Sequence, residues 1–395
     1  VRLVHAATAG SRRSASSRLS ADPPMTSNAT QLKIAFIGAR GVGGTYSGIE
    51  TYYEEVGSRL AERGHEVTAY CRNYFTPDTE IYRGIRVRRL PSLRSKHFET
   101  LSHSVLSALD SLFRDYDIVQ FHALGSAPLA ILPRILGKKT VVSVRGLDWQ
   151  REKWGRLARW VLQSGEWASV RLPSSTIVVS ETLRDHYRDR HGRETRVIPN
   201  AVIPAEPRAV DRIAEFGLQK DQFLLFVGRI SPEKGVHTLL EALEPLPRSK
   251  KLVLAGGGSY SDSYIEGVKA RAWEEVLVLG KVDHETNQEL LSNCYAFVLP
   301  STIEGLSIAL LEALSFGTCI LTTSIPENLE VVGEAALVFP PDDVEALRDC
   351  LRAILESPDL VHHHRELVAA RAEEWPDWDG VAEQTEKFYL ELVSA

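Results

Sequence analysis

The chain has 395 residues, of which 44% are hydrophobic and 25% charged, and its formal net charge at pH 7 is −6. These values indicate a globular protein of two or three domains, and no apolar run approaches the roughly 20 residues of a membrane span. The four cysteines are widely spaced, which argues against a zinc site or a disulfide framework and favours buried thiols in a reducing cytoplasm.

The first thirty residues are rich in Ser, Arg and Ala and show no hydrophobic periodicity. We expect a disordered tail, although a transit peptide has a similar composition. The single methionine of the chain is Met25, and the first strand-like run begins soon afterwards at Lys33. We therefore predict that Met25 is the initiator and that the preceding residues are an upstream extension.

From Lys33 onward, strand-like apolar runs alternate with helical patterns. We interpret as strands Lys33–Gly38, Glu66–Cys71, Arg86–Leu90, Asp117–Phe121, Thr140–Val144, Thr176–Ser180, Arg196–Pro199, Phe223–Val227, Lys251–Ala255, Val276–Leu279, Ala296–Leu299 and Cys319–Thr322. Two successive sets of strands separated by helices predict an α/β protein with two doubly wound, Rossmann-like parallel sheets. Such sheets bind their ligands at the carboxyl ends of the strands.

The first strand leads into a glycine-rich loop, Gly38–Glu50. Its glycines allow the backbone to approach a diphosphate closely. The loop lacks the ending of a Walker motif, and Tyr46 stands where the Gly-X-Gly-X-X-Gly pattern needs its third glycine. We therefore disfavour a dinucleotide-dependent dehydrogenase. Glu50 stands at the start of the following helix, where a favourable interaction with the helix dipole is sufficient to explain an acidic residue.

Two further polar positions lie where strands of the first half end. His122 closes the strand that begins at Asp117, and Arg145 follows the next strand, with Asp148 three residues later. These positions face the ligand crevice of a parallel sheet. A lone histidine is more often structural than catalytic, so both interpretations of His122 stay open.

A proline-containing segment, Ile198–Pro204, separates the two sets of strands and indicates a linker. We predict a disordered tail over 1–30, a first domain over 31–203 and a second domain over 204–376. A final helix over 377–395 follows a turn.

Charge is distributed unevenly along the chain. Residues 31–200 carry 26 Lys and Arg against 18 Asp and Glu, whereas residues 201–395 carry 16 against 33. The basic residues are concentrated at Arg83–Arg89 and Arg151–Arg159. Most surface arginines are simply solvated; the functional alternative is attraction to an anionic lipid surface or a phosphate-bearing acceptor.

The turn Gly228–Gly235 follows a strand in the second half and contains Arg229 and Lys234. Two cations on one proline-containing turn can converge on a single anion, with the arginine as a fork and the lysine as a point charge. Either cation alone is more simply explained as surface charge.

The stretch Ser301–Leu314 combines an acidic turn with a helix start. Glu304 lies in the turn, Ser307 is a suitable N-cap, and Glu312 falls within the helix. Free N–H groups at a helix start bind phosphate, and flanking carboxylates bind hydroxyls, which is the layout of a sugar nucleotide. A solvated turn glutamate and an ordinary surface glutamate explain this stretch equally well, but the cations of the preceding turn favour the functional interpretation.

On these motifs the chain resembles the retaining family 4 glycosyltransferases of the GT-B architecture, from about Lys33 to its end. The most specific matches are Gly228–Gly235, Glu304–Ser307 and Glu312–Leu314, and the supporting ones are Arg63–Val67, Ile198–Ala201 and Pro326–Val331. The resemblance implies two domains facing a cleft, with the final helix returning to the first domain.

The resemblance also implies the roles of individual residues. The implied donor-binding residues are Gly43, Gly44, Gly228, Arg229, Lys234, Gly280, Val282, Glu304, Gly305, Leu306, Ser307 and Glu312. Those given a catalytic role are His122, Arg229, Lys234 and Glu304. Arg145 and Asp148 fall on the acceptor side.

The first half is most similar to bacterial rhamnosyltransferases, through Ile37–Gly41 and Tyr46–Thr51. Ser47 and Ile49 depart from that pattern, and Arg145 stands where many relatives have histidine. The resemblance implies a UDP- or dTDP-sugar donor. Because of these departures, dTDP-rhamnose is one candidate among such donors.

The predicted reaction transfers a sugar, with retention, to a hydroxyl of a glycan or lipid-linked acceptor in cell-surface polysaccharide synthesis. We expect no metal or other cofactor and no nucleic-acid partner. We also expect a cytoplasmic protein that can lie peripherally on an anionic membrane. Two alternatives are a sugar-nucleotide epimerase or hydrolase of the same shape, and a catalytically dead nucleotide-sugar-binding protein.

Overall fold

The computed structural model describes residues 30–43, 48–93, 99–150, 155–202, 205–258 and 262–395. Leu32–Ala395 form one compact unit. The predicted tail, apart from residue 30, and the predicted initiator Met25 lie outside the described residues.

The first sheet has the strand order β3-β4-β2-β1-β5-β6-β7-β8 and is parallel except for the β3–β4 pair. Its strands are β1 (Lys33–Ile37), β2 (Glu66–Arg72), β3 (Ile81–Tyr82), β4 (Ile85–Leu90), β5 (Ile118–His122), β6 (Lys139–Val144), β7 (Ser175–Val178) and β8 (Arg196–Val197). The helices of this part are α1 (Gly48–Glu62), α2 (Glu99–Leu112), α3 (Ile131–Ile135), α4 (Arg156–Arg171) and α5 (Glu181–His191), with short 3-10 turns η1 (Ala127–Ala130) and η2 (Asp148–Gln150).

The second sheet is parallel throughout, in the order β11-β10-β9-β12-β13-β14. Its strands are β9 (Phe223–Val227), β10 (Lys251–Ala255), β11 (Val276–Gly280), β12 (Ala296–Leu299), β13 (Ile320–Thr323) and β14 (Leu337–Phe339). Its helices are α6 (Val236–Leu243), α7 (Asp262–Arg271), α8 (His284–Asn293), α9 (Ile308–Ser315), α10 (Pro326–Val332), α11 (Val344–Glu356) and α12 (Pro358–Glu373), with 3-10 turns η3 (Arg212–Phe216) and η4 (Pro232–Lys234). The central strands are buried on both faces, as continuous apolar runs require.

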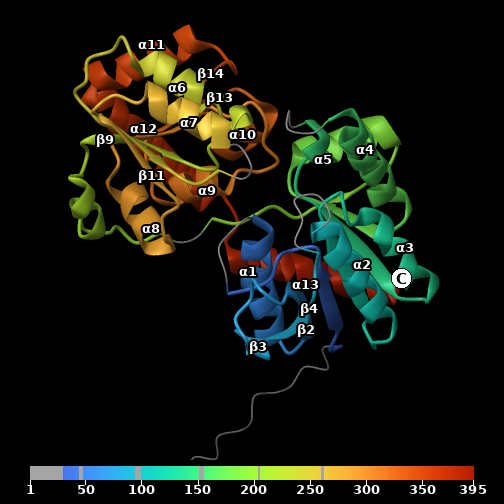
Figure 1. Ribbon diagram of the computed structural model, residues 1–395. Helices are drawn as coiled ribbons and strands as arrows, with labels where there is room; N and C mark the ends of the chain where they lie inside the picture. Colours follow the sequence, from blue (N-terminus) through green and yellow to red (C-terminus); the bar gives the residue numbers. More distant parts are fainter. Residues whose placement is uncertain (1–29, 44–47, 94–98, 151–154, 203–204, 259–261) are drawn as a thin grey trace, which may run out of the picture. The chain divides into compact units, whose positions relative to one another are not determined.

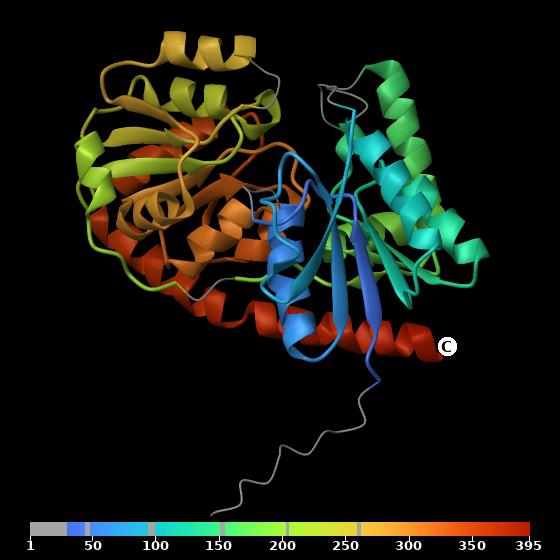
Figure 2. The same ribbon diagram turned by 60° about the horizontal axis from the view of Figure 1, so that its bottom comes forward.

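The last helix, α13 (Trp378–Ser394), packs against α1 rather than against the second sheet. Both views show it in red beside α1 in blue (Figures 1 and 2). Arg59 of α1 pairs with Asp379 at 2.8 Å, and Trp378 and Tyr389 belong to the core of the first sheet. The end of the chain is thereby part of the first domain's core.

The predicted fold class is confirmed: two Rossmann-like parallel sheets are present, and every strand expected from the sequence occurs with shifts only at its ends. Two strands were not expected, β3 and β14. Each has at most three residues and lies at a sheet edge, which is too short for a periodic pattern to indicate.

Candidate active site

The turn that follows β12 ends in a capped helix start. Ser307 is the N-cap of α9, and its hydroxyl accepts a hydrogen bond from the Leu310 N–H, so the N-cap prediction is confirmed. Gly305 and Leu306 precede it, and Leu306 is buried. The first N–H groups of α9 remain oriented toward the turn, which favours an anion there.

Lys234 and Glu304 form an ion pair beside this helix start. Lys234 Nζ lies 2.5 Å from Glu304 Oε1, and both side chains are largely buried. The backbone holds them together, because the Thr302 N–H donates to the Glu233 carbonyl oxygen at 3.0 Å. Gly235 follows with φ +66°, and a Cβ there would lie 2.1 Å from the Pro300 carbonyl oxygen. A side chain at position 235 would therefore separate the lysine turn from the glutamate turn.

Arg229, the other predicted diphosphate ligand, is partly exposed at the end of β9. Its Nη2 lies 3.8 Å from Oε1 of Glu233, a buried carboxylate on η4. Each predicted cation of the second domain is thus matched by a carboxylate on the same set of turns. The sequence did not suggest the role of Glu233 because its spacing from Arg229 is that of an ordinary surface pair.

Glu312, predicted to bind the ribose, lies on α9 and faces α8. Its Oε2 accepts a hydrogen bond from Asn287 Nδ2 at 3.1 Å. It also lines a small hollow with Ala205, His284, Gln288, Leu291, Ser315 and Phe316. Burial raises the pKa of Glu312 to about 7. Glu304 and Glu312 therefore have different partners and do not form a carboxylate pair.

Glycine backbones meet where β9, β10 and β11 end. The Gly228 N–H donates to the Ala255 carbonyl oxygen at 3.0 Å, and the Gly256 N–H donates to the Gly280 carbonyl oxygen at 2.6 Å. A Cβ on Gly256 would lie 1.8 Å from the Gly228 carbonyl oxygen. The predicted donor residues Gly228 and Gly280 thus lie at adjoining strand ends, with Val282 two residues beyond Gly280.

His122 closes β5 and is 1% exposed. Its Nε2 lies 3.1 Å from the Gln120 amide nitrogen, and its Nδ1 is buried without a hydrogen-bond partner. The rings of Phe36, Tyr52 and Tyr53 surround the imidazole. Burial lowers the pKa of His122 well below its ordinary value, and the nearby Arg145 charge lowers it further, so the ring is neutral at physiological pH.

Arg145 follows β6 and donates from Nη1 to the Asn200 side-chain oxygen at 2.6 Å. Its guanidinium carbon lies 4.1 Å from the centre of the Tyr52 ring. Sequence reasoning gave no role to Asn200, although it lies in the motif Ile198–Ala201. The other predicted acceptor-side residue, Asp148, begins η2, and its side chain lies outside the described part of the structure.

The described part of the glycine-rich loop is held by carboxylates of α1. The Gly43 N–H donates to Glu54 Oε1 at 2.8 Å, and the Arg40 N–H donates to Glu50 Oε1 at 2.9 Å. Glu50 is buried, so it supports this loop as well as complementing the helix dipole. Gly44 lies outside the described residues.

Elements of the two sheets touch at the Glu304–Ser307 turn. A Cβ on Gly305 would lie 1.8 Å from the Arg145 carbonyl oxygen, and a Cβ on Gly48 would lie 3.4 Å from the Ile308 side chain. The starts of α1 and α9 therefore lie close together. We call the contact of Arg145–Gly146 with Gly305, together with that of Gly48 with Ile308, the seam.

A second contact between the two parts lies on α10. The Glu330 carboxylate accepts hydrogen bonds from the Glu181 N–H at 2.7 Å and the Thr182 N–H at 3.2 Å. These are free N–H groups at the start of α5, which a carboxylate complements.

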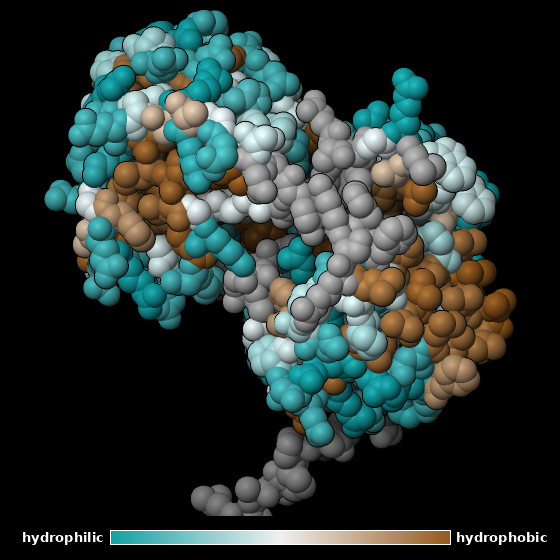
Figure 3. Space-filling view, viewed as in Figure 1, coloured by the Kyte–Doolittle hydropathy of each residue, from teal (hydrophilic) through white to brown (hydrophobic). Residues whose placement is uncertain are grey.

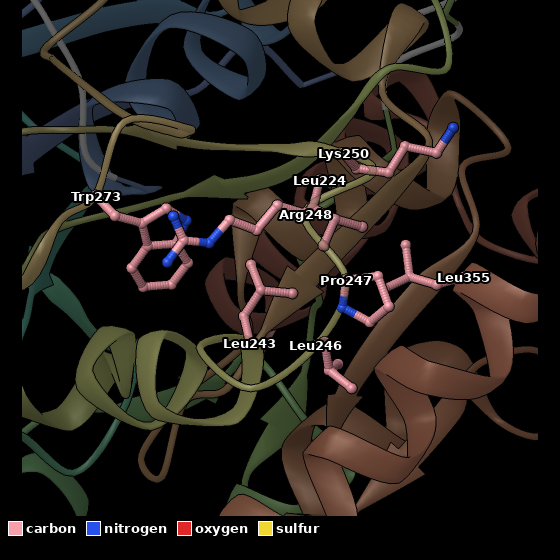
Figure 4. A pocket seen from close by; sticks show the side chains of 8 residues that line it. All are labelled: Leu224, Leu243, Leu246, Pro247, Arg248, Lys250, Trp273 and Leu355. Atoms are coloured by element: carbon pink, nitrogen blue, oxygen red, sulfur yellow. The ribbon is translucent and has the colours of Figure 1, made fainter.

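A further hollow lies at the other end of the second sheet (Figure 4). It is bordered by residues near the amino ends of β9, β10 and β11, and the Arg248 guanidinium lies 5.5 Å from the Trp273 ring centre. Because ligands of parallel sheets bind at the carboxyl ends, this hollow is not part of the candidate site.

Within the described ranges, no group of three or more His, Cys, Asp or Glu side chains is arranged to hold a metal ion. Over the same residues, no helix has the length and apolar character needed to cross a bilayer.

Two family models match most of the chain between them. "Glycosyltransferase Family 4" matches residues 46–206, and "Glycosyl transferases group 1" matches residues 211–374. Among curated relatives, the glycogen synthase of Mycobacterium tuberculosis is 28% identical over 381 residues, covering 87% of this chain and 91% of the relative. The D-rhamnosyltransferase WbpZ of Pseudomonas aeruginosa is 30% identical over 175 residues, covering 38% and 45%, so the predicted similarity to rhamnosyltransferases is supported in part.

Solved structures share the fold over nearly the whole chain. The sucrose-phosphate synthase of Thermosynechococcus elongatus superimposes with a TM-score of 0.80 at 23% identity, covering 92% of this chain and 100% of that one. Anabaena Alr3699/HepE in complex with UDP and glucose gives a TM-score of 0.76 at 16% identity, covering 91% and 99%. The chain therefore belongs to the family 4 glycosyltransferases and has their GT-B fold.

Proposed function

We propose that the protein transfers a sugar, with retention, from a UDP- or dTDP-sugar to a hydroxyl of a glycan or lipid-linked acceptor in cell-surface polysaccharide synthesis. The second domain binds the donor and the first domain binds the acceptor. No metal ion is required in this proposal, because Arg229, Lys234 and the start of α9 stabilise the departing diphosphate.

The observation that carries the proposal is the Lys234–Glu304 ion pair beside the capped start of α9. An ammonium held by a carboxylate can turn to a phosphate oxygen when a diphosphate arrives. Glu304 then becomes free to accept hydrogen bonds from sugar hydroxyls. As the glycosidic bond breaks, the departing phosphate takes the proton of the acceptor hydroxyl, which attacks the same face of the sugar.

Support for the donor class comes from relatives. HepE has been solved with UDP and glucose, and WbpZ is named as a D-rhamnosyltransferase. We therefore propose UDP-glucose as the first donor to test. The name of WbpZ supports rhamnose as a transferred sugar, and dTDP-rhamnose, which the sequence resemblance implies, is the second donor to test.

The test is a panel of nucleotide sugars in which released nucleotide and glycosylated product are measured together, with a membrane lipid extract as acceptor source. We expect release that depends on the acceptor and persists in excess EDTA. Arg229→Ala should weaken binding of free nucleotide by about tenfold or more, because it removes a hydrogen bond to a charged group. Release without acceptor would favour the epimerase or hydrolase alternative, and binding without turnover would favour a dead site.

We also propose peripheral attachment to an anionic membrane, but not through the stretch Arg83–Arg89. Its arginines pair with carboxylates of Glu55, Glu66, Asp110 and Asp78, so little of that charge is available to lipid. An exposed surface on α2, α3 and the residue that follows each helix, which we call the apolar face (Figure 3), is formed instead by Leu106, Leu109, Phe113, Ile135 and Leu136. The exposed Arg134 and the partly buried Lys138 lie next to it in the sequence, and apolar side chains mixed with cations suit an anionic bilayer surface.

A further inference from the structure

Arg145 is partly buried, but its guanidinium carries two buried nitrogens, and no ion pair among the described residues balances its charge. Nη1 is occupied by Asn200, whereas Nε and Nη2 are buried without hydrogen-bond partners. The ionisable groups that raise its pKa are the phenols of Tyr52, Tyr389 and Tyr53. Burial lowers the pKa of Arg145 only to about 10, so the side chain is a cation at neutral pH. Proteins normally pair a buried cation, and an unpaired one indicates a missing anion.

The two unpartnered nitrogens lie on one edge of the guanidinium. Nε–H and Nη2–H are parallel donors with the spacing of two oxygens on one phosphate or carboxylate. Asn200 occupies the opposite end and fixes the plane of the group, while Tyr52 covers one of its faces. The site is therefore arranged for bidentate recognition of an oxyanion.

The donor turns of the second domain need such a charge. Arg229 lies near Glu233, and Lys234 is paired with Glu304, so these four side chains have no net charge. Burial raises the pKa of Glu327, and the charges of Glu304 and Glu330 raise it further, which indicates acidic surroundings. A diphosphate bound beside these turns adds negative charge that a further cation can balance, in addition to Arg229, Lys234 and the start of α9.

The position of Arg145 meets this need. Its carbonyl oxygen touches Gly305 of the donor turn, and its partner Asn200 lies beside Gly48, which contacts Ile308 at the start of α9. Arg145 thus lies on the seam, next to the starts of two helices that both favour negative charge.

We propose that Arg145 binds an oxyanion of the nucleotide-sugar donor, with the diphosphate as the first candidate. The same edge would also bind a carboxylate on the transferred sugar, and the experiment below separates these two sources. The proposal rests on the proposed function and assigns Arg145 to the donor rather than to the acceptor side, where family resemblance places it.

The test compares the full chain with Arg145→Gln and Arg145→Lys, and uses Arg171→Gln, at an exposed position on α4, as the matched control. Pyrophosphate, UDP, UDP-glucose and UDP-glucuronic acid are titrated by calorimetry at constant ionic strength. If the diphosphate is the ligand, Arg145→Gln weakens pyrophosphate and UDP binding by about tenfold to a hundredfold. Arg145→Lys loses less, because it keeps the charge without the fork.

If a sugar carboxylate is the ligand, pyrophosphate and UDP bind all variants equally. In that case the wild-type chain prefers UDP-glucuronic acid to UDP-glucose, and Arg145→Gln loses this preference. Either pattern supports the proposal. Unchanged affinity of Arg145→Gln for all four probes would overturn it.

Thermal unfolding without ligand separates this role from a structural one. A buried charge held for a ligand destabilises the free protein, so Arg145→Gln should melt no lower than the wild type. A lower Tm together with unchanged affinities would make Arg145 a structural residue. If the wild-type chain binds none of the probes, the same titrations are made with dTDP and dTDP-rhamnose; absence of binding to these as well sinks the proposed function, whereas wild-type binding that Arg145→Gln leaves unchanged sinks only the assignment of Arg145.

Discussion

Burial between α8 and α9 raises the pKa of Glu312 to about 7, against about 4.3 for an unfolded glutamate. Between these two values the folded chain binds more protons than the unfolded chain. The stability that protonated Glu312 contributes is therefore fully present below about pH 4.3. It is lost as the pH rises through about 7.

Glu312→Gln removes this titration and keeps an oxygen for the Asn287 amide. We expect the variant and the wild type to unfold alike at pH 5, and the variant to be more stable by about 1–3 kcal/mol at pH 8. Urea denaturation at the two pH values measures the difference, with Glu334→Gln, at an exposed position, as the control. If the free energy of unfolding depends on pH equally in Glu312→Gln and the wild type, the pKa of Glu312 is not raised in the folded chain.

His122 is the second residue whose role can be tested directly. Its ring is neutral and nearly inaccessible to solvent. Any contact with the transferred sugar therefore forms only when the cleft between the two domains changes its shape during turnover. His122→Ala should lower kcat by roughly tenfold to a thousandfold and leave the Kd for UDP nearly unchanged. Product release and calorimetry measure the two quantities, and His122→Asn checks that the loss is not caused by the cavity left among the aromatic rings. Near wild-type turnover in both variants would make His122 structural.

At the scale of elements, Gly305 links the donor turn to the first domain. Its backbone φ is not positive, so the second domain alone does not require glycine there. A Cβ would nevertheless lie 1.8 Å from the Arg145 carbonyl oxygen. Gly305→Ala should therefore separate the two turns at the seam without straining either sheet.

We expect Gly305→Ala to lower kcat at least tenfold while both domains remain folded, because catalysis needs the two halves of the site together. Turnover and circular dichroism check this expectation. Gly267→Ala is the matched control, since Gly267 lies in α7 with nothing within 4 Å of its Cβ position, and it should leave turnover unchanged. Full activity in Gly305→Ala would show that the two turns can separate at this point of the seam without loss of turnover.

Local signals predicted the elements that carry the donor turns. The apolar run 296–299 and the N-cap Ser307 follow from strand burial and capping chemistry, which depend on neighbouring residues alone. The same signals could not predict Arg145 with Asn200, 55 residues apart, or Glu330 capping α5, 149 residues away. Those contacts depend on how separate elements pack, and no periodicity records that packing. The basic stretch Arg83–Arg89 shows the same limit, because its carboxylate partners lie on other elements.

At the scale of the whole molecule, the chain places its donor turns and its apolar face on different domains. The donor turns belong to the acidic half of the sequence, and the apolar face belongs to the basic half. Attachment through the first domain would bring the proposed acceptor-binding half to a lipid-linked acceptor while the second domain meets the donor in solution.

Vesicle binding tests this arrangement. We expect the full chain to bind anionic vesicles, to bind neutral vesicles weakly, and to be released as salt rises, because exposed charges are screened. The double variant Phe113→Gln/Leu136→Gln should lose most of this binding, since Phe113 is 89% exposed and Leu136 is 59% exposed on the apolar face. Ile81→Gln is the matched control, because Ile81 is 62% exposed on β3 at the far edge of the sheet from β8. Equal binding to neutral and anionic vesicles would remove the electrostatic part of the proposal. If the double variant instead abolishes a dimer seen by sedimentation, and no vesicle binding is found, the apolar face is an interface between two copies of the chain.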